Sequence, residues 1–162
     1  MKATISVVSG EVWAVKQDII LKSDGIGSCV VVAAYDSKNK IGSLSHIMLP
    51  GRSIKSEMRY DSKYAYDAIE DMLFKMKRLG AVKGSIEACL VGGGNVLNIK
   101  SDTLCDEIIN SVVGILDEKG IKVIMKAVGG VLRRSVSLDV GAGAAYYTEG
   151  NGNTSVLYKW EN

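Results

Sequence analysis

The feature that most constrains the fold is an uninterrupted apolar run, Cys29–Tyr35 (CVVVAAY), rich in β-branched valines. A run of this length and composition is typical of a strand that is buried on both faces. A turn at Asp36–Asn39 follows, and Lys40–Leu49 then runs back in the opposite direction. The two segments predict a β-hairpin, which would bring Cys29 close to His46 across the paired strands.

The remaining pattern predicts an α/β (α+β) chain folded as one domain over residues 1–162. Short apolar stretches separated by turn residues predict strands at Thr4–Val8, Glu11–Val15, Ile19–Lys22, Ile86–Val91, Val123–Ala127, Ser135–Leu138, Ala144–Tyr147 and Ser155–Lys159. Helical periodicity predicts two helices. The first would be capped by Asp61-Ser62 and end at Gly80, and the second would run from about Ser101-Asp102 to Gly120.

Composition excludes several classes of function. Twenty basic and 18 acidic residues give a net charge of only +2, and no basic stripe suggests nucleic-acid binding. No apolar run approaches the length of a membrane span, and the first residues lack the pattern of a signal peptide. The three cysteines have no Cys-x-x-Cys spacing, so we expect no disulfide framework and no metal site. A reduced, cytoplasmic setting is the natural interpretation.

The segment Ser23–Cys29 (SDGIGSC) is the strongest candidate for chemistry. Its two glycines permit backbone conformations closed to other residues, and they lead directly into the buried strand. A cysteine at the mouth of such a turn is held rigidly, and the N–H groups of Gly27 and Ser28 could stabilise an oxyanion. A core cysteine with no chemical role fits the same pattern. A dinucleotide-binding loop does not fit, because Val30 occupies the position of the third glycine.

His46 is the only histidine in the chain and therefore the only candidate for a histidine base. Strand alternation puts it on one face with Leu44 and Met48, which predicts a half-buried ring that could take a proton from a thiol. A structural histidine is the alternative. Cys89 and Cys105 fall on apolar faces and are expected to be inert. The glycines at 92–94 and 129–130 follow apolar strands, where they could form turns or the walls of an active-site cleft. Gly92 and Gly93 are the candidates for the substrate cleft.

Taken together, these motifs resemble the CheD family of chemoreceptor glutamine deamidases. The family's Gly-x-Gly-Ser-Cys segment is matched by residues 25–29, and its histidine followed by apolar residues and proline is matched by residues 46–50. Its Lys-Tyr pair resembles Lys63-Tyr64. Its glycine pairs resemble Gly92-Gly93 and the start of residues 129–136.

The resemblance implies Cys29 as nucleophile, His46 as base and Ser23, where the family usually has threonine, as the hydroxyl that orients the histidine. It implies stacked mixed β-sheets with helices outside, similar to the catalytic domain of the cytotoxic necrotizing factor toxins. The implied reaction is conversion of glutamine to glutamate in the cytoplasmic domains of chemoreceptors, with no cofactor. The implied partner is a CheC-type phosphatase. Two alternatives stay open: a non-catalytic chemotaxis adaptor, and a cysteine hydrolase of free small amides.

Overall fold

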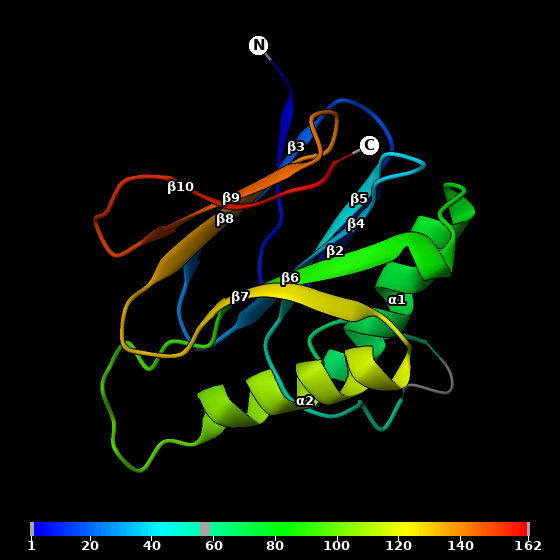
Figure 1. Ribbon diagram of the computed structural model, residues 1–162. Helices are drawn as coiled ribbons and strands as arrows, with labels where there is room; N and C mark the ends of the chain where they lie inside the picture. Colours follow the sequence, from blue (N-terminus) through cyan, green and yellow to red (C-terminus); the bar gives the residue numbers. More distant parts are fainter. Residues whose placement is uncertain (1, 56–58, 162) are drawn as a thin grey trace.

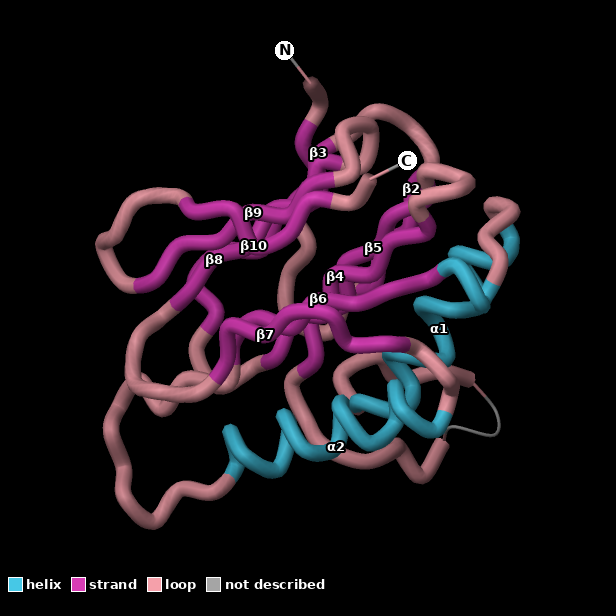
Figure 2. Tube along the Cα trace, in the orientation of Figure 1, coloured by secondary structure: helices cyan, strands magenta, loops and turns pink. Residues whose placement is uncertain are grey.

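Two five-stranded sheets are stacked face to face, and both α-helices cover the outer face of the second sheet (Figure 1). The computed structural model describes residues 2–55 and 59–161. The layer order is therefore sheet, sheet, helices, which confirms the expected α+β class of stacked mixed sheets with helices outside (Figure 2). The likeness to the necrotizing-factor toxins stays a prediction.

The first sheet combines the start of the chain with its end. β1 pairs with β3 in parallel, and the other neighbours are antiparallel. In spatial order its strands are β1 (Thr4–Ser6), β3 (Ile20–Ile26), β8 (Arg134–Asp139), β9 (Ala144–Glu149) and β10 (Ser155–Lys159).

The second sheet contains the doubly buried strand. In spatial order its strands are β2 (Val12–Val15), β5 (Ile41–Ile47), β4 (Val30–Asp36), β6 (Ile86–Gly92) and β7 (Lys122–Val128). The helices are α1 (Ala65–Arg78), α2 (Leu104–Glu118) and a short 3₁₀ turn, η1 (Lys83–Ser85). No helix in residues 2–55 and 59–161 is long and apolar enough to cross a membrane.

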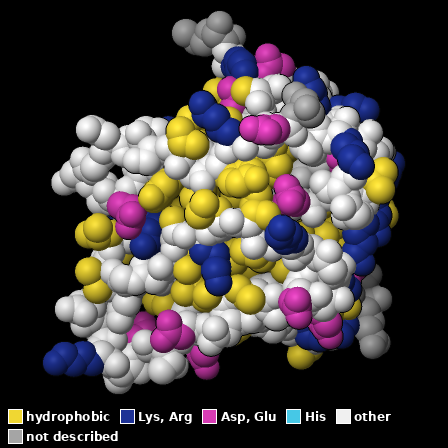
Figure 3. Space-filling view, viewed as in Figure 1, with side chains coloured by type: hydrophobic (Ala, Val, Ile, Leu, Met, Phe, Trp, Pro, Cys, Tyr) yellow, Lys and Arg dark blue, Asp and Glu magenta, His cyan; other side chains and the backbone are white. Residues whose placement is uncertain are grey.

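The second sheet has a hydrophobic core on each side, and this explains its composition. Every residue of β4 and β5 is buried, as the valine-rich run predicts. Val31, Ala33 and Leu44 face the first sheet, whereas Val32 and Ile47 face the helices. Along the open side of the sandwich, between β10 and β7, Figure 3 shows hydrophobic side chains gathered with lysine or arginine among them. No histidine is visible on that face.

The structure confirms the predicted strands with shifted ends. β3 runs on to Ile26 instead of stopping at Lys22, because it continues to pair with β8 beyond a bulge between Ser23 and Ile26. The register Val31↔His46 confirms the β4–β5 hairpin. The second helix begins at Leu104, slightly later than expected.

The expected cap of the first helix is wrong. α1 begins at Ala65 with Tyr64 as its N-cap residue, and no side chain caps it. The Ser62 hydroxyl instead donates to the Asp71 carboxylate, at 3.0 Å. Buried Asp67 accepts hydrogen bonds from the backbone N–H groups of Ser53 and Asp61. The preceding loop is thus tied to the body of the helix through tertiary contacts that helix-capping preferences do not encode.

Candidate active site

The β4–β5 hairpin places Cys29 and His46 on the same face of the second sheet. His46 lies opposite Val31, and Cys29 precedes Val31 by two residues. Cys29 therefore points, like Val31, toward the first sheet and packs against the core between the sheets. Diagonal positions of this kind lie about 7–8 Å apart between Cα atoms, within reach of a long side chain such as histidine. The structure thus brings the expected nucleophile and base into one neighbourhood.

The contacts of His46 determine which ring nitrogen is available. Nδ1 lies 3.2 Å from the backbone oxygen of Val7. A carbonyl oxygen can only accept, so in the neutral ring Nδ1 carries the proton and Nε2 keeps a free lone pair. The His46 backbone is also fixed, because its N–H donates to the Glu11 oxygen and its oxygen accepts from the Gly10 N–H. The ring is thus held as a tautomer that can take a proton through Nε2.

Burial keeps the ring neutral. His46 is only 4% exposed, so the expectation of a half-buried ring is wrong. The segment around Val7 covers the imidazole ring between the two sheets. Burial lowers the pKa of His46, while the hydrogen bond to Val7 and the charge of Glu11 act in the opposite direction. The resting imidazole is therefore poised to act as a base at neutral pH.

Ser23 lies in the site, but its hydrogen-bond partner is the Val7 carbonyl and not the His46 ring. Its side chain is buried, and its hydroxyl donates to the Val7 oxygen at 2.6 Å. His46 uses the same oxygen. Ser23 therefore reaches the histidine through a shared backbone acceptor. Sequence reasoning missed Val7, because a carbonyl group that every residue carries leaves no signal in the sequence.

Gly92 and Gly93 lie against the backbone of Cys29. The Gly93 N–H donates to the Cys29 oxygen at 2.7 Å, and the Gly94 N–H donates to the Gly27 oxygen at 2.9 Å. Gly92 has φ +122°, and a Cβ atom added there would lie 2.2 Å from the Cys29 oxygen. Both Gly92 and Gly93 are buried. Both glycines contact the backbone of Cys29, and their role as the wall of a substrate cleft stays a prediction.

A hollow of about 190 Å³ opens beside the nucleophile loop. Gly27 and Ser28 form one side of it, and Asp102, Cys105 and Arg133 contribute to the rest together with residues 94–97. Two joined loops surround it, since the Asn95 N–H donates to the Gly130 oxygen at 2.8 Å. These loops expose the large apolar side chains Leu97, Ile99, Val131 and Leu132.

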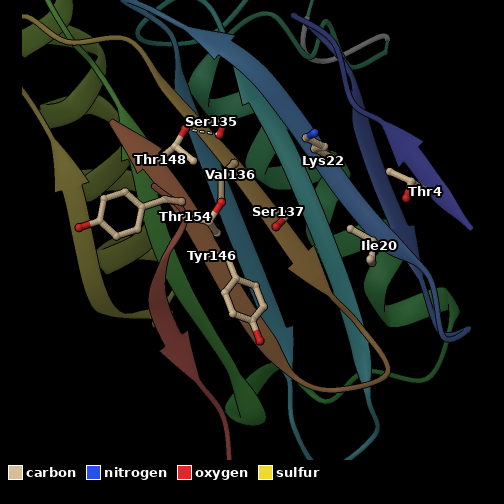
Figure 4. Close-up of a pocket in the computed structure, with 10 residues that line it drawn as sticks. Thr4, Ile20, Lys22, Ser135, Val136, Ser137, Tyr146, Thr148 and Thr154 are labelled. Atoms are coloured by element: carbon tan, nitrogen blue, oxygen red, sulfur yellow. Dashed lines mark hydrogen bonds between the residues drawn. The ribbon is translucent and has the colours of Figure 1, made fainter. Parts of the chain in front are cut away.

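A larger hollow, about 350 Å³, lies elsewhere, on the outer face of the first sheet (Figure 4). Ser135 and Thr148 share a hydrogen bond within it, and Lys22 and Tyr146 lie nearby (Figure 4). Its lining residues include neither a cysteine, a histidine nor a carboxylate. It therefore offers no nucleophile–base pair for acyl transfer.

The three cysteines differ in surroundings. Cys29 is half-buried, and desolvation raises the pKa of its thiol, while a hydrogen bond with the Ser9 side chain acts in the opposite direction. Burial raises the pKa of Cys89 to about 12, and burial also raises the pKa of Cys105. Cys29 and His46 therefore rest as a neutral thiol and a neutral imidazole.

In the part of the chain that the structure describes, no group of three cysteine, histidine or acidic side chains could hold a metal ion.

Comparison with known proteins gives one consistent answer. The family model described as CheD chemotactic sensory transduction matches residues 48–149. A probable chemoreceptor glutamine deamidase CheD from Chlorobium luteolum is 30% identical over 96% of this chain and 78% of the relative. Proteins of the same name from Clostridium novyi and Clostridium botulinum are 40% and 34% identical, over 65% and 75% of this chain and 68% and 78% of the relatives. The family model starts after Cys29 and His46, whereas the Chlorobium alignment spans both.

Proposed function

The chain belongs to the CheD family, and on that premise we propose that it deamidates glutamine side chains of chemoreceptors, with Cys29 as nucleophile and His46 as base. The observation that carries the proposal is the match over 96% of the chain to a protein named as a probable chemoreceptor glutamine deamidase. The neutral His46 ring on the face shared with Cys29 supports the assignment of roles. The enzyme class is that of a cysteine-dependent amidohydrolase.

The proposed reaction is a two-step acyl transfer. Nε2 of His46 takes the proton of the Cys29 thiol as the sulfur attacks the amide carbon of glutamine. The resulting imidazolium gives its proton to the departing nitrogen, and ammonia leaves while a thioester remains. Water then attacks the thioester with His46 as the base, which releases glutamate and restores the thiol. Neither step requires a cofactor, because the thiol, the imidazole and water supply every proton and nucleophile.

The peptide groups before Cys29 are candidates for the oxyanion site. The Gly27 carbonyl faces Gly94, and the N–H of a trans peptide points away from its carbonyl. The N–H of Ser28 is therefore directed to the other side of this peptide, free of the contact with Gly94. Backbone donors so placed are worth about 10²–10³ in rate each when they face the developing charge. We propose the Ser28 N–H, together with the neighbouring Gly27 N–H, as the oxyanion donors.

A protein substrate fits the surroundings of the site better than a free amide. The loops that carry Leu97, Val131 and Leu132 expose apolar surface beside Gly27 and Ser28. The Asn95 side chain keeps the first loop in shape, because its Nδ2 donates to the Ile99 oxygen and its Oδ1 accepts from the Ile99 N–H. A preformed apolar rim can contact residues that flank a glutamine in a protein, whereas free glutamine offers nothing to bury there.

The adaptor hypothesis makes a different prediction about Cys29. A chemotaxis adaptor that binds a CheC-type phosphatase or receptors needs no reactive thiol, whereas the deamidase does. A CheC-type partner stays a prediction for this chain. The cytoplasmic location also stays a prediction. It follows from the proposed substrate, which is the cytoplasmic domains of receptors.

The deciding experiment is incubation of the protein with cytoplasmic fragments of chemoreceptors from its own organism, followed by peptide mass spectrometry. We expect glutamine-to-glutamate conversion at defined positions, and none with Cys29→Ala. Free glutamine serves as the competing substrate. Conversion of free glutamine alone would favour the small-amide hydrolase, and an unreactive Cys29 together with unmodified receptors would favour the adaptor.

A further inference from the structure

A tight turn joins the two sheets directly beside the candidate nucleophile. The Glu11 N–H donates to the Val8 oxygen at 2.9 Å, and Gly10 has φ +83°, as the third position of a type II turn requires. The Glu11 carboxylate closes the turn by accepting the Val8 N–H at 3.0 Å. Ser9 occupies the second position of this turn, and its side chain is exposed.

Contacts on both sides of Ser9 fix where the turn sits. The Gly10 N–H donates to the His46 oxygen at 2.8 Å, and a Cβ atom on Gly10 would lie 3.8 Å from Sδ of Met48. Met48 follows β5, and Cys29 precedes β4. The pairing of Val30 with Ile47 makes Cys29 and Met48 the next cross-strand neighbours. The turn therefore lies over the end of the hairpin where the thiol is found.

This location places Ser9 beside the Cys29 thiol, in line with the lowering effect of the Ser9 side chain on the pKa of that thiol. Val7, on one side of Ser9, binds His46 and Ser23 through its carbonyl oxygen. Gly10, on the other side, binds the His46 backbone. A single short segment, residues 7–10, thus binds Ser23 and His46 and lies beside Cys29.

We propose that Ser9 is a positioning residue of the catalytic centre, whose hydroxyl donates to the Cys29 sulfur and stabilises the thiolate formed when His46 takes the proton. The inference rests on the proposed function for its purpose, but the contact itself requires no substrate. A half-buried thiolate lacks much of its hydration, so a hydroxyl donor offsets part of the desolvation. The carbonyl of Val7 holds the base, and the hydroxyl of Ser9 holds the nucleophile.

The test measures the thiol without any glutamine substrate. Cys29 is alkylated with iodoacetamide over a range of pH, and its modification is separated from that of Cys89 and Cys105 by peptide mass spectrometry. In Ser9→Ala the alkylation rate at neutral pH should fall about threefold to tenfold, as expected for one lost hydrogen bond, and the pH profile should move upward. Ser9→Thr keeps the hydroxyl and should restore the wild-type profile.

The matched control is Ser37→Ala, a serine-to-alanine change in the turn at the far end of β4, which should leave the profile unchanged. Denaturant unfolding establishes that the variants are folded. Alkylation of Ser9→Ala at the wild-type rate across the range, or failure of Ser9→Thr to restore the rate, overturns the inference. If the wild-type protein does not deamidate receptor fragments but Ser9→Ala still slows the alkylation of Cys29, the proposed function is overturned and the role of Ser9 is not.

Discussion

Ser23 and His46 share one acceptor: the backbone oxygen of Val7 lies 2.6 Å from Oγ of Ser23 and 3.2 Å from Nδ1 of His46. Ser23 comes from the first sheet and His46 from the second, and Val7 lies between them. A main-chain carbonyl therefore fixes the tautomer of the base, a role that a carboxylate fills in many hydrolases. Because it carries no charge, it stabilises an imidazolium less than a carboxylate does.

Replacing Cys29 with alanine should abolish deamidation, by at least about a thousandfold, because covalent catalysis has no substitute nucleophile. His46→Ala should have a comparable effect, since residues that act as a unit fail together. The measurement is the rate of glutamine conversion in a receptor fragment. Retained activity in Cys29→Ala, with the protein shown to be folded by circular dichroism, would rule out the mechanism.

Ser23→Ala should reduce the rate far less, by about twofold to tenfold, because it removes one hydrogen bond from Val7 while the bond from His46 remains. Ser23→Thr restores the hydroxyl that the family usually has and should keep or raise activity. Comparing kcat for the two variants with the wild type measures the effect. A loss in Ser23→Ala as large as in Cys29→Ala would show that Ser23 does more than support the carbonyl.

Activity should persist below the ordinary pKa of histidine, about 6.5, because burial lowers the pKa of His46 and the ring must be neutral to act as a base. His46 is the only histidine, so its ring signal in proton NMR can be titrated without further assignment. A midpoint below about 6.5 is expected. A midpoint above it would indicate a thiolate–imidazolium pair, and Cys29→Ser tests that coupling by removing the thiol.

The same shift affects stability. When the pKa of His46 is lower in the folded state, the unfolded chain binds the proton first as the pH falls. This group therefore stabilises the fold above about 6.5, and its contribution is lost as the pH falls toward the folded pKa. Urea unfolding of the wild type and His46→Gln over this range should differ in pH dependence. Parallel curves would contradict a depressed pKa.

Gly92→Ala should destabilise the protein by about 1–3 kcal/mol, because a Cβ atom there would lie 2.2 Å from the Cys29 oxygen and φ is +122°. It should also lower activity, since the backbone of the nucleophile must shift. Gly84→Ala is the matched control, with ordinary φ and open space around its Cβ. Urea unfolding and alkylation of Cys29 measure the two effects, and equal stability of the two variants would contradict the close contact.

Leu97→Ser should weaken action on a receptor fragment several-fold in kcat/KM while leaving Cys29 alkylation unchanged, because the 77% exposed side chain rims the site without supporting it. Val82→Ser is the control. It is also an exposed apolar side chain, but its N–H contacts Asp36, at the opposite end of β4 from Cys29. Equal kcat/KM for Leu97→Ser and the wild type would place substrate recognition elsewhere.

The sequence by itself determined the central hairpin and the approach of Cys29 to His46. An unbroken valine-rich run has to be buried on both faces, and the length of the turn at Asp36–Asn39 sets which residues pair across it. The alternation along β5 likewise determined that His46 shares a face with Leu44. These are local consequences of strand geometry, so they can be derived before any tertiary contact is known.

Only the tertiary structure decided how the base is held and how deeply it is buried. The Val7 carbonyl meets both the His46 ring and the Ser23 hydroxyl because the segment around Val7 crosses between the two sheets. The start of α1 is likewise decided by tertiary contacts, since Asp67 and Asp71 bind the loop in which the local pattern predicts a helix cap. Backbone carbonyls are identical at every position, and their partners depend on how distant segments are brought together, which residue patterns do not record.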